Sequence, residues 1–463
     1  MLSAIFAERS RAHASRVRRL AASLSEWMEG IMYKHVWTLL IAMGLSLIVA
    51  TNAHADPIAA LGARTPAIAI DPVLDRGMIV YEDGGRIYGK FVDNAGHGID
   101  GDFLVLPVNP ASNLKYKDPA IVFKTPQNRF YIAARQSFSS EFNLPSGPIV
   151  FDTADGIAVT AYDAAGTRLA TRTLFTPGFL RNALTENAEA RPAIAVDTIA
   201  DASCCVAVAW EDARAPTQLH LMRLSPDLAL FDAAPRAIAT SAGNVTSLSA
   251  TYNRRRDRFA FAYDGCSSPG RGCNTFITAL PALLDGAERS LSLPERTLST
   301  RSYGYPSIAY VPGSDRLLVS SGFATSATTT VAASRGVAAF SVVTASDGTM
   351  TEEPSRRLLS VTGSLVGSAL PVVPRNRSQV IALGTQPRAM IVASSVTSDG
   401  RDRFVGYTID IATMRVSRAD AFSSAAAYIP TGGGAYSPSS GRVIGTWRQD
   451  TREASIWAFP VIP

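Results

Sequence analysis

A recurring stretch of residues constrains the fold of this chain more than any other feature of its sequence. The first copy, residues 66–83, reads as a short apolar strand, a polar turn and a second apolar strand ending in Tyr81-Glu82-Asp83. Related stretches begin near positions 119, 192, 248, 306, 368 and 432. A period of this length with strand-like content is typical of repeat architectures in which each unit is one small supersecondary element.

Each copy continues with a third strand, a tight turn and a fourth strand. Residues 86–92 and 156–162 are third strands, and Asp347-Gly348 marks a later hairpin turn, because glycine tolerates the positive φ that such turns require. Second strands such as residues 206–210 are continuously apolar, which indicates burial on both faces. With almost no helical periodicity, the pattern predicts an all-β, seven-bladed β-propeller, with six or eight blades as alternatives.

The two ends of the repeat series predict how the ring closes. The last copy ends after its third strand, so residues 56–62 are expected to add the fourth strand and remove an exposed sheet edge. The sixth copy is the weakest. Residues 368–374 are assigned as its first strand and 379–383 as its second, while the apolar stretch 388–394 is either its third strand or a displaced second one.

The repeat pattern resembles a known group of proteins. Its elements are Pro-Ala-Ile-Ala-x-Asp, then Asp/Asn-Arg-Phe, then an apolar run ending in Trp/Tyr-Glu-Asp. This resembles the blade repeat of secreted bacterial β-propeller proteins, many of them without assigned function, and it covers nearly all of residues 56–463. The resemblance implies the fold and not an activity, because propellers carry many unrelated functions.

The N-terminal segment reads as a secretory signal. A 15-residue apolar run, residues 36–50, follows Lys34 and precedes a small-x-small site ending at Ala55. The run is shorter than the ~20 residues that a membrane-spanning helix needs. We therefore expect cleavage after Ala55, either Met1 or Met32 as the true start, and no stable membrane span afterwards.

Removing the lead leaves a single predicted domain, residues 56–463, that is exported to the periplasm or beyond the cell. The lead holds six of the 44 basic and three of the 39 acidic residues, so the remaining chain has a net charge of only +2. No basic tract with interleaved aromatic residues remains, which argues against a nucleic-acid partner.

All four cysteines lie in the predicted mature chain. In an exported protein, Cys266 and Cys273, which bracket a six-residue loop, are expected to form a disulfide. The adjacent Cys204 and Cys205 either form a vicinal disulfide or remain reduced and buried. The cysteine spacing does not match a zinc site, so no metal is expected.

The candidate ligand-binding residues follow the second strands. In a propeller, the loops from second to third strands and the crossings between blades share one face, here called the funnel face. The residues predicted to converge there are Glu82, Asp83, Arg135, Trp210, Glu211, Asp212, Asp264, Trp447, Arg448 and Asp450. They could bind a sugar, a cation or a basic peptide, provide paired carboxylates for glycoside hydrolysis, or simply pair with neighbouring loops. Their repetition favours the structural role.

Histidine content argues against several enzyme classes. Only His97 and His220 remain after the lead, so a Ser-His-Asp triad is not expected, and no cofactor motif occurs. Two departures from the repeat, residues 137–155 and 177–191, lengthen funnel-face connections. They either carry function, as such insertions in propellers commonly do, or are neutral insertions. We predict a binding or scaffold module for a glycan or protein ligand, of undetermined oligomeric state. The alternative is a carbohydrate-active hydrolase or lyase.

Overall fold

The computed structural model divides the chain into two compact units, Met1–His54 and Ala55–Pro463. The residues it describes all belong to the second unit; they are 64–107, 114–144, 147–175, 192–199, 204–211, 218–239, 244–268, 271–282, 289–293, 301–325, 334–359, 378–396, 402–421, 433–448 and 454–460. The predicted signal peptide and the predicted closing strand at residues 56–62 lie outside the described residues.

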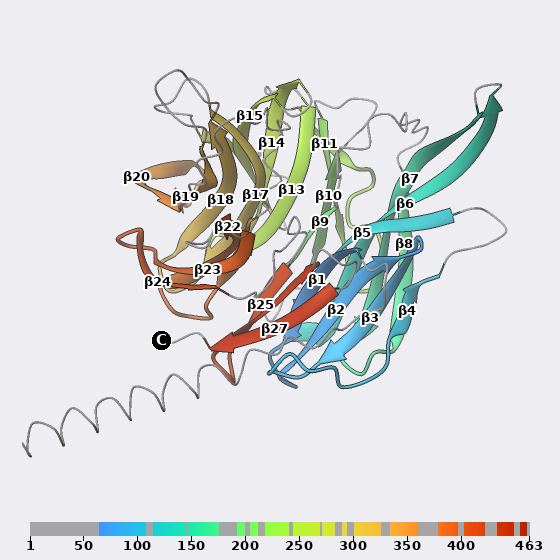
Figure 1. Cartoon of the computed structure of the whole chain (residues 1–463), viewed down its shortest axis with the longest axis horizontal. Coiled ribbons are helices and arrows are strands. Elements are labelled where there is room, and N and C mark those ends of the chain that lie inside the picture. Colours follow the sequence, from blue (N-terminus) through green and yellow to red (C-terminus); the bar gives the residue numbers. More distant parts are fainter. Residues whose placement is uncertain are drawn as a thin grey trace, which may run out of the picture. The chain divides into compact units, whose positions relative to one another are not determined.

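The described part of the chain is almost entirely β-strand (Figure 1). The first strands of the successive sheets are β1 (Arg64–Asp71), β5 (Leu114–Lys124), β9 (Ala193–Val196), β13 (Asn244–Asn253), β17 (Arg301–Val311), β21 (Ser378–Ala382) and β25 (Gly433–Ser437). The second strands are β2 (Arg76–Asp83), β6 (Arg129–Leu144), β10 (Val206–Glu211), β14 (Arg258–Ser268), β18 (Arg316–Thr325), β22 (Arg388–Val396) and β26 (Arg442–Arg448).

The outer strands complete each sheet. The third strands are β3 (Arg86–Val92), β7 (Gly147–Asp163), β11 (Gln218–Leu224), β15 (Arg271–Pro281), β19 (Ser334–Thr344), β23 (Asp402–Asp410) and β27 (Ala454–Pro460). The fourth strands are β4 (Phe103–Leu106), β8 (Arg168–Phe175), β12 (Arg236–Ala239), β16 (Arg289–Leu293), β20 (Met350–Leu359) and β24 (Arg415–Ala421). A single 3₁₀ turn, η1 (Thr125–Gln127), is the only helical element among the described residues.

These strands form small antiparallel sheets in chain order. The described residues make six four-stranded sheets and one three-stranded sheet, the last, and every strand pairs with its neighbours in sequence. Each first strand contacts the first strands of the adjacent sheets, and β25 contacts β1. Figure 1 shows β25 beside β1, and β26 also contacts β1. The prediction of an all-β chain built from four-stranded antiparallel units is confirmed.

The core lies between consecutive sheets. Met78 and Val80 of β2 pack with Phe130 and Ile132 of β6, and comparable clusters join the second sheet to the third, the third to the fourth, the fourth to the fifth and the fifth to the sixth. A further cluster joins the first sheet to Ile444 of the last. Second strands such as β10 are buried along their whole length, as their continuously apolar sequence predicts.

The dipeptide of Asp, Asn or Gly followed by Arg, which stands at the start of five of the seven described second strands, has two structural roles within the repeat. Its first residue adopts the left-handed conformation that closes the hairpin, with φ of 51° at Asp75, 53° at Asn128, 49° at Asp257 and 52° at Asp315. Asp, Asn and Gly tolerate this region best, and Gly441, with φ of 64°, takes the position in the last sheet. The turn thereby explains why the repeat prefers Asp or Asn before arginine.

The arginine of the dipeptide joins neighbouring sheets. Arg129 Nη1 donates to the Pro226 carbonyl oxygen at 3.1 Å and pairs with Asp227 at 2.6 Å, both in the connection between β11 and β12. Arg258 Nη2 likewise donates to the Asp347 carbonyl oxygen at 3.2 Å, in the turn between β19 and β20. The repeated arginine is therefore a structural contact between one sheet and the next.

Hydroxyl side chains connect the first strands of adjacent sheets, whose backbones are not paired with one another. Ile308 N donates to Ser249 Oγ at 3.1 Å, and Val380 N donates to Ser307 Oγ at 2.9 Å. These bonds satisfy N–H groups that would otherwise be exposed along a strand edge. At the contact of β25 with β1 the backbones approach closely, since a Cβ added at Gly433 would lie 3.2 Å from Ala67 Cα.

The strand assignment predicted for the sixth unit is wrong for residues 379–383, whereas the alternative that made 388–394 a displaced second strand is right, because β22 follows β21 in the sheet. Residues 379–383 are not its second strand: β21 pairs with β22 and contacts the first strands β17 and β25, so β21 is the first strand. Arg388 then occupies the start of the second strand, as Arg76 does in the first sheet. The stretch 368–374, assigned as the first strand because of its apolar sequence, lies outside the described residues.

The first long departure from the repeat is not a loop. Residues 137–155 extend β6 and β7 into one long antiparallel hairpin whose pairing runs from Arg129 with Asp163 to Leu144 with Gly147. The extension keeps the alternating pattern of a strand pair, which explains why it continues the ladder. The second departure, residues 177–191, lies outside the described residues.

Candidate functional site

The predicted funnel-face residues occupy equivalent positions in successive sheets. Six residues after the arginine that opens the second strand lie Glu82 in the first sheet, Arg135 in the second, Asp264 in the fourth and Arg448 in the last. In the third sheet Glu211, five residues after Val206 at the start of β10, ends the second strand. Gly322 and Ser394 take this position in the fifth and sixth sheets. One register position thus varies between acid, base and small residue around the series of sheets.

In the first two sheets this position belongs to a buried charge network. Asp118 N donates to Glu82 Oε2 at 3.4 Å, and the Asp118 carboxylate pairs with Arg135 Nη2 at 3.1 Å. Glu82 and Asp118 are both buried, with 8% and 6% of their surfaces exposed. Asp118 therefore connects the two sheets through its backbone N–H, while its carboxylate pairs with Arg135 within the second sheet.

Asp118 is a site residue that the sequence did not reveal. It lies in β5 where the register with β6 shifts between Lys117 and Ala120, and its φ is 53°. The same shift occurs in β1 next to Thr65, whose φ is 48°. In both strands a proline follows, which cannot donate to the ladder and is confined to edges and bulges. The Asp-Pro dipeptide was the available signal.

Asp264 is held by hydroxyl groups in the fourth sheet. Ser247 Oγ donates to Asp264 Oδ2 at 2.8 Å, and Thr275 Oγ1 lies 3.4 Å from Oδ1. Thr275 Oγ1 also lies 2.8 Å from Ser321 Oγ in the fifth sheet. Only 1% of the Asp264 surface is exposed, so this carboxylate is held within the fourth sheet and does not line an open surface, while Thr275 makes the contact with the fifth sheet.

Aromatic residues just before this position stack across the sheet. Trp210 stacks on His220 with ring centroids 5.7 Å apart, and Tyr81 on Tyr88 at 5.8 Å. Trp210 is 4% exposed and Glu211 is 7% exposed, so both belong to the packed part of the third sheet. Burial, followed by the hydrogen bond with Asp102, raises the pKa of Tyr81, which keeps its hydroxyl protonated.

The structure gives less detail on the remaining residues that were predicted for the funnel face. Asp83 ends β2 and is partly exposed. Trp447 and Arg448 lie in β26, but the structure describes only their backbone, and Asp212 and Asp450 lie outside the described residues. Cys266 and Cys273 are direct register partners of β14 and β15. The disulfide between them stays a prediction.

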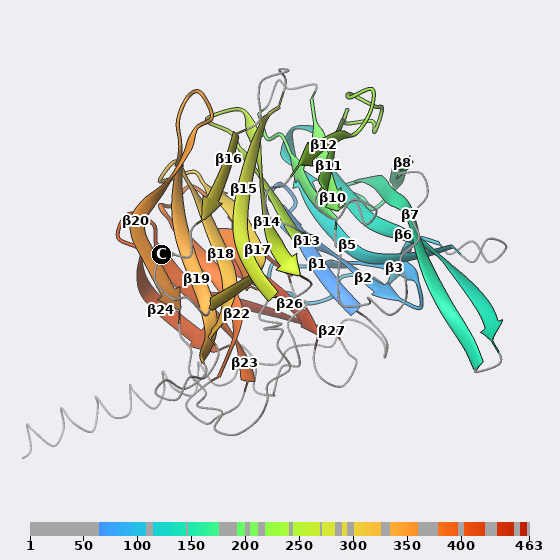
Figure 2. The same ribbon diagram turned by 90° about the horizontal axis from the view of Figure 1, so that it is seen from above.

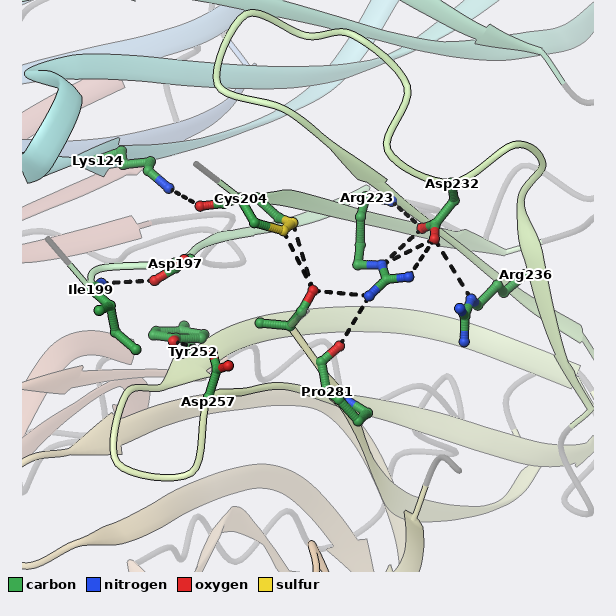
Figure 3. Close-up of a disulfide and its surroundings, with 12 residues drawn as sticks. Lys124, Asp197, Ile199, Cys204, Arg223, Asp232, Arg236, Tyr252, Asp257 and Pro281 are labelled. Carbon is green, nitrogen blue, oxygen red and sulfur yellow. Dashed lines mark hydrogen bonds and ion pairs between the residues drawn. A yellow bond between two sulfur atoms is a disulfide. The ribbon is translucent and has the colours of Figure 1, made fainter. Parts of the chain in front are cut away.

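A second group of buried charges lies at the opposite end of the sheets, where first strands turn into second strands (Figure 3). Lys124, at the end of β5, is fully buried, and its Nζ donates to the Cys204 carbonyl oxygen at 2.6 Å. Burial lowers the pKa of Lys124, while the negative charge of Asp197 opposes that shift. Fully buried lysines are rare, and no pattern in the sequence indicated this one.

Asp197 faces this lysine from the end of β9. Its Oδ1 accepts a hydrogen bond from Ile199 N at 2.7 Å, and burial raises the pKa of the carboxyl group. Tyr252 donates to Asp257 Oδ1 at 2.6 Å beside it, and burial followed by that hydrogen bond raises the pKa of Tyr252. Lys124, Asp197 and Tyr252 come from the first strands of three consecutive sheets, so the group joins those sheets.

The vicinal cysteines lie next to this group. The structure pairs Cys204 with Cys205, and both residues are fully buried. Their sulfur atoms lie within 3.6 Å of the Ala282 carbonyl oxygen, which also accepts a bond of 2.9 Å from Arg223 Nη1. Arg223 in turn forms a buried ion pair with Asp232, visible in Figure 3.

Metal and membrane features are limited in the described part of the chain. It contains no cluster of three or more His, Cys, Asp or Glu side chains arranged to hold a metal ion. Within the same residues, no helix has the length and apolar character required to span a bilayer.

Comparisons with known proteins give no family. No protein-family model matches the chain, and no curated protein matches its sequence. Among solved structures, the GH93 α-L-arabinofuranosidase of Fusarium graminearum, in complex with arabinobiose, is 10% identical, with a TM-score of 0.45, over 88% of this chain and 96% of that one.

Two further solved structures have similar coverage. The subtype N10 neuraminidase-like protein of A/little yellow-shouldered bat/Guatemala/060/2010 is 10% identical, with a TM-score of 0.41, over 89% of this chain and 97% of that one. The Dos1 propeller is 11% identical, with a TM-score of 0.40, over 88% and 96%. Likeness at this level says nothing about activity.

Proposed function

We propose that this chain is an exported seven-bladed β-propeller that acts as a binding or scaffold module. The seven described sheets follow one another with their first strands in contact, and β25 adjoins β1, which supports a ring of seven blades. Residues 56–62 would supply the strand that the last sheet lacks. Export would follow from cleavage after Ala55, and the periplasm or the cell exterior would be the location.

The variation at one register position carries the proposal of binding. The end of each sheet that holds the Asp/Asn-Arg turn is repetitive, and its side chains join sheets. At the funnel face, the equivalent residues differ from sheet to sheet, among them Glu82, Arg135 and Asp264. Because Glu82 and Asp264 are buried, the ligand would contact the differing connections that follow these positions, with the partly exposed Asp83 among the contacting residues, since function on propellers resides in such variable ends. The ligand would be a glycan or a protein.

The burial of the described acids favours binding over hydrolysis. Glycoside hydrolysis generally needs two carboxyl groups about 5–9.5 Å apart with the sugar between them. Glu82, Glu211 and Asp264 are each at least nine-tenths buried, and Asp264 is held by hydroxyl donors within the sheets. A hydrolase remains the alternative activity for the same face.

The test is a glycan array followed by an activity screen. The purified protein is applied to the array, and any glycan that binds is then incubated with it while released sugar is measured. Asp83→Asn, which changes a partly exposed residue of the funnel face, is expected to weaken binding several-fold. Asp100→Asn, at the opposite end of the first sheet and exposed, is the matched control.

Each outcome decides between the two activities. Binding without sugar release, reduced by Asp83→Asn and unchanged by Asp100→Asn, supports the binding module. Release of sugar that follows the concentration of the protein would replace it with the hydrolase. N-terminal sequencing of the purified protein tests the export step, which requires Asp56 as the first residue.

A further inference from the structure

The long hairpin of β6 and β7 carries two different faces. Its outer part, here called the arm, consists of residues 138–144 of β6 and 147–153 of β7. The register pairs Phe138 with Thr153, Phe142 with Ile149 and Leu144 with Gly147. Because residues directly opposite in an antiparallel pair share a face and alternate residues change face, the register alone sorts the arm into two sides.

One side is apolar and the other is polar. The apolar side comprises Phe138, Ser140, Phe142, Leu144, Gly147, Ile149, Phe151 and Thr153. The polar side comprises Ser139, Glu141, Asn143, Pro148, Val150 and Asp152. Five large hydrophobic residues thus share one side with no charged residue, while both acids of the arm lie on the other.

The arm extends past the strands that flank it. On the side of β6, strand β5 pairs only as far as Phe138, opposite Leu114. On the side of β7, strand β8 pairs only as far as Gly156, opposite Phe175. Among the described strands, the arm is therefore a two-stranded ribbon, and Figures 1 and 2 both show it projecting from the sheets.

A ribbon of this kind needs a partner for its apolar side. An isolated two-stranded hairpin is marginally stable in water, and a sheet with one apolar face is stable when that face packs on another layer. The arm adds five large apolar residues to one face at the point where its own chain stops providing strands. The sequence therefore places large apolar residues along one side of a ribbon that no other described strand flanks.

We infer that the arm is a dimerisation element, and that its apolar side packs on the same side of a second copy of this chain. If fully covered, the three phenylalanines at ~150 Å² or more each would bury at least roughly 450 Å² per copy, and Leu144 and Ile149 would add to that area. The combined area approaches the ~800 Å² per partner of a standard stable interface. The lack of charge on this side lets it face itself across a two-fold axis without repulsion, as an isologous interface requires.

Cysteine substitution at two adjacent serines tests the inference directly. Ser140→Cys places a thiol in the middle of the apolar side, and Ser139→Cys places one on the polar side of the same strand. Under oxidising conditions, Ser140→Cys is expected to give a covalent dimer on a non-reducing gel. Ser139→Cys and the parent protein are expected to remain monomeric on that gel.

Light scattering after gel filtration supplies the second measurement. The parent protein is expected to have the mass of two chains, and Phe142→Glu is expected to have the mass of one chain. Asn143→Glu, which adds the same charge on the polar side, is expected to keep the mass of the parent. Circular dichroism and thermal melting of each variant test whether it is folded. Ser139→Cys and Ser140→Cys provide a further test that leaves the apolar residues unchanged.

Several results would overturn the inference. One is a parent protein that has the mass of a single chain at every concentration. This holds also if that monomer binds lipid vesicles or another protein through the arm. Another is a dimer that Phe142→Glu leaves intact while the variant is folded. Equal cross-linking of Ser139→Cys and Ser140→Cys would also exclude an interface on the apolar side.

Discussion

The Lys124 ammonium lies 2.6 Å from the Cys204 carbonyl oxygen and so joins the end of β5 to the segment that precedes β10 in the next sheet. Lys124 is fully buried, and Asp197 provides a negative charge nearby. We expect Lys124→Met to lower the free energy of unfolding by about 2 kcal/mol, because it leaves a buried carbonyl and a buried carboxylate without their cation. Denaturant unfolding measures the loss.

A double-mutant cycle separates the charge effect from the packing effect. Lys124→Met combined with Asp197→Asn removes both charges while an amide can still accept the bond from Ile199 N. The loss in free energy of unfolding in the double variant should be about 1 kcal/mol smaller than the sum of the losses in the two single variants. Additive losses would show that the two charges do not interact.

The arginine that opens β6 should contribute more than its exposed ion-pair partner. Arg129→Ala removes bonds to both the Pro226 carbonyl and Asp227, so a loss of about 1–2 kcal/mol is expected. Asp227→Ala should cost no more than about 0.5 kcal/mol, since the Asp227 side chain is 81% exposed. Urea titration of the two variants checks the order, and equal losses would contradict the proposed contact between sheets.

The left-handed residue before this arginine provides a test of the turn. Asn128 has φ of 53° and ψ of 49° after η1. Asn128→Gly should leave the melting temperature almost unchanged, whereas Asn128→Val should cost about 1–2 kcal/mol, because a β-branched residue is strained in this conformation. Thermal unfolding of the pair is the measurement. A tolerated valine would mean that the hairpin relaxes to another turn.

Stability should depend on pH through Asp410. Its Oδ1 accepts bonds from Thr413 N at 3.0 Å and Thr413 Oγ1 at 2.9 Å, and these lower the pKa of the carboxyl group. A folded-state pKa below the unfolded value of ~3.9 gives stabilisation that is present above pH ~4 and lost as the pH falls through the folded-state pKa. Asp410→Ala should therefore lose about 0.5–1 kcal/mol at neutral pH.

The matching measurement compares unfolding at neutral and acid pH. The difference between Asp410→Ala and the parent should shrink as the pH is lowered below ~4, because the parent then loses the same contribution. Asp410→Asn keeps an acceptor oxygen and should show a smaller difference from the parent at neutral pH, which also shrinks as the pH falls because only the parent carboxyl group titrates. A constant difference for Asp410→Ala from neutral to acid pH would rule out this role.

The predicted disulfide between Cys266 and Cys273 can be tested chemically. The two residues are register partners across β14 and β15. Peptide mapping without reduction should recover them in one linked fragment, and replacing both by alanine should lower stability by about 2.5 kcal/mol. Recovery of free thiols from the exported protein would refute the pairing.

The repeated hairpins could be predicted because their period and turn chemistry are local properties of the sequence. The Asp-Arg dipeptide, for example, sets a left-handed turn at Asp257 without help from distant residues. The sixth sheet was misassigned because one apolar stretch resembles another until the contacts of β21 with β17 and β25 are known.

The burial of charged residues could not be predicted from the sequence, for a different reason. Lys124 ends an ordinary strand, and its burial depends on the neighbouring sheet that carries Cys204. Asp118 required knowledge of a bulge and of the position of Arg135. The sequence pattern placed Glu82 and Glu211 near the ends of β2 and β10, but it could not show that Asp264 lies inside β14 or that these three acids are buried.

The contact of the first sheet with the last has a consequence for folding order. Most contacts within a sheet form between neighbours in sequence, but Ser437 Oγ donates to Asp75 across 362 positions. During synthesis from the N-terminus, the strands of the first sheet are complete long before Ser437 is added. The edge of β1 that contacts the last sheet therefore stays exposed until the C-terminal part of the chain has been synthesised. Truncations near the C-terminus should therefore damage the N-terminal sheet, the part of the molecule farthest from them in sequence.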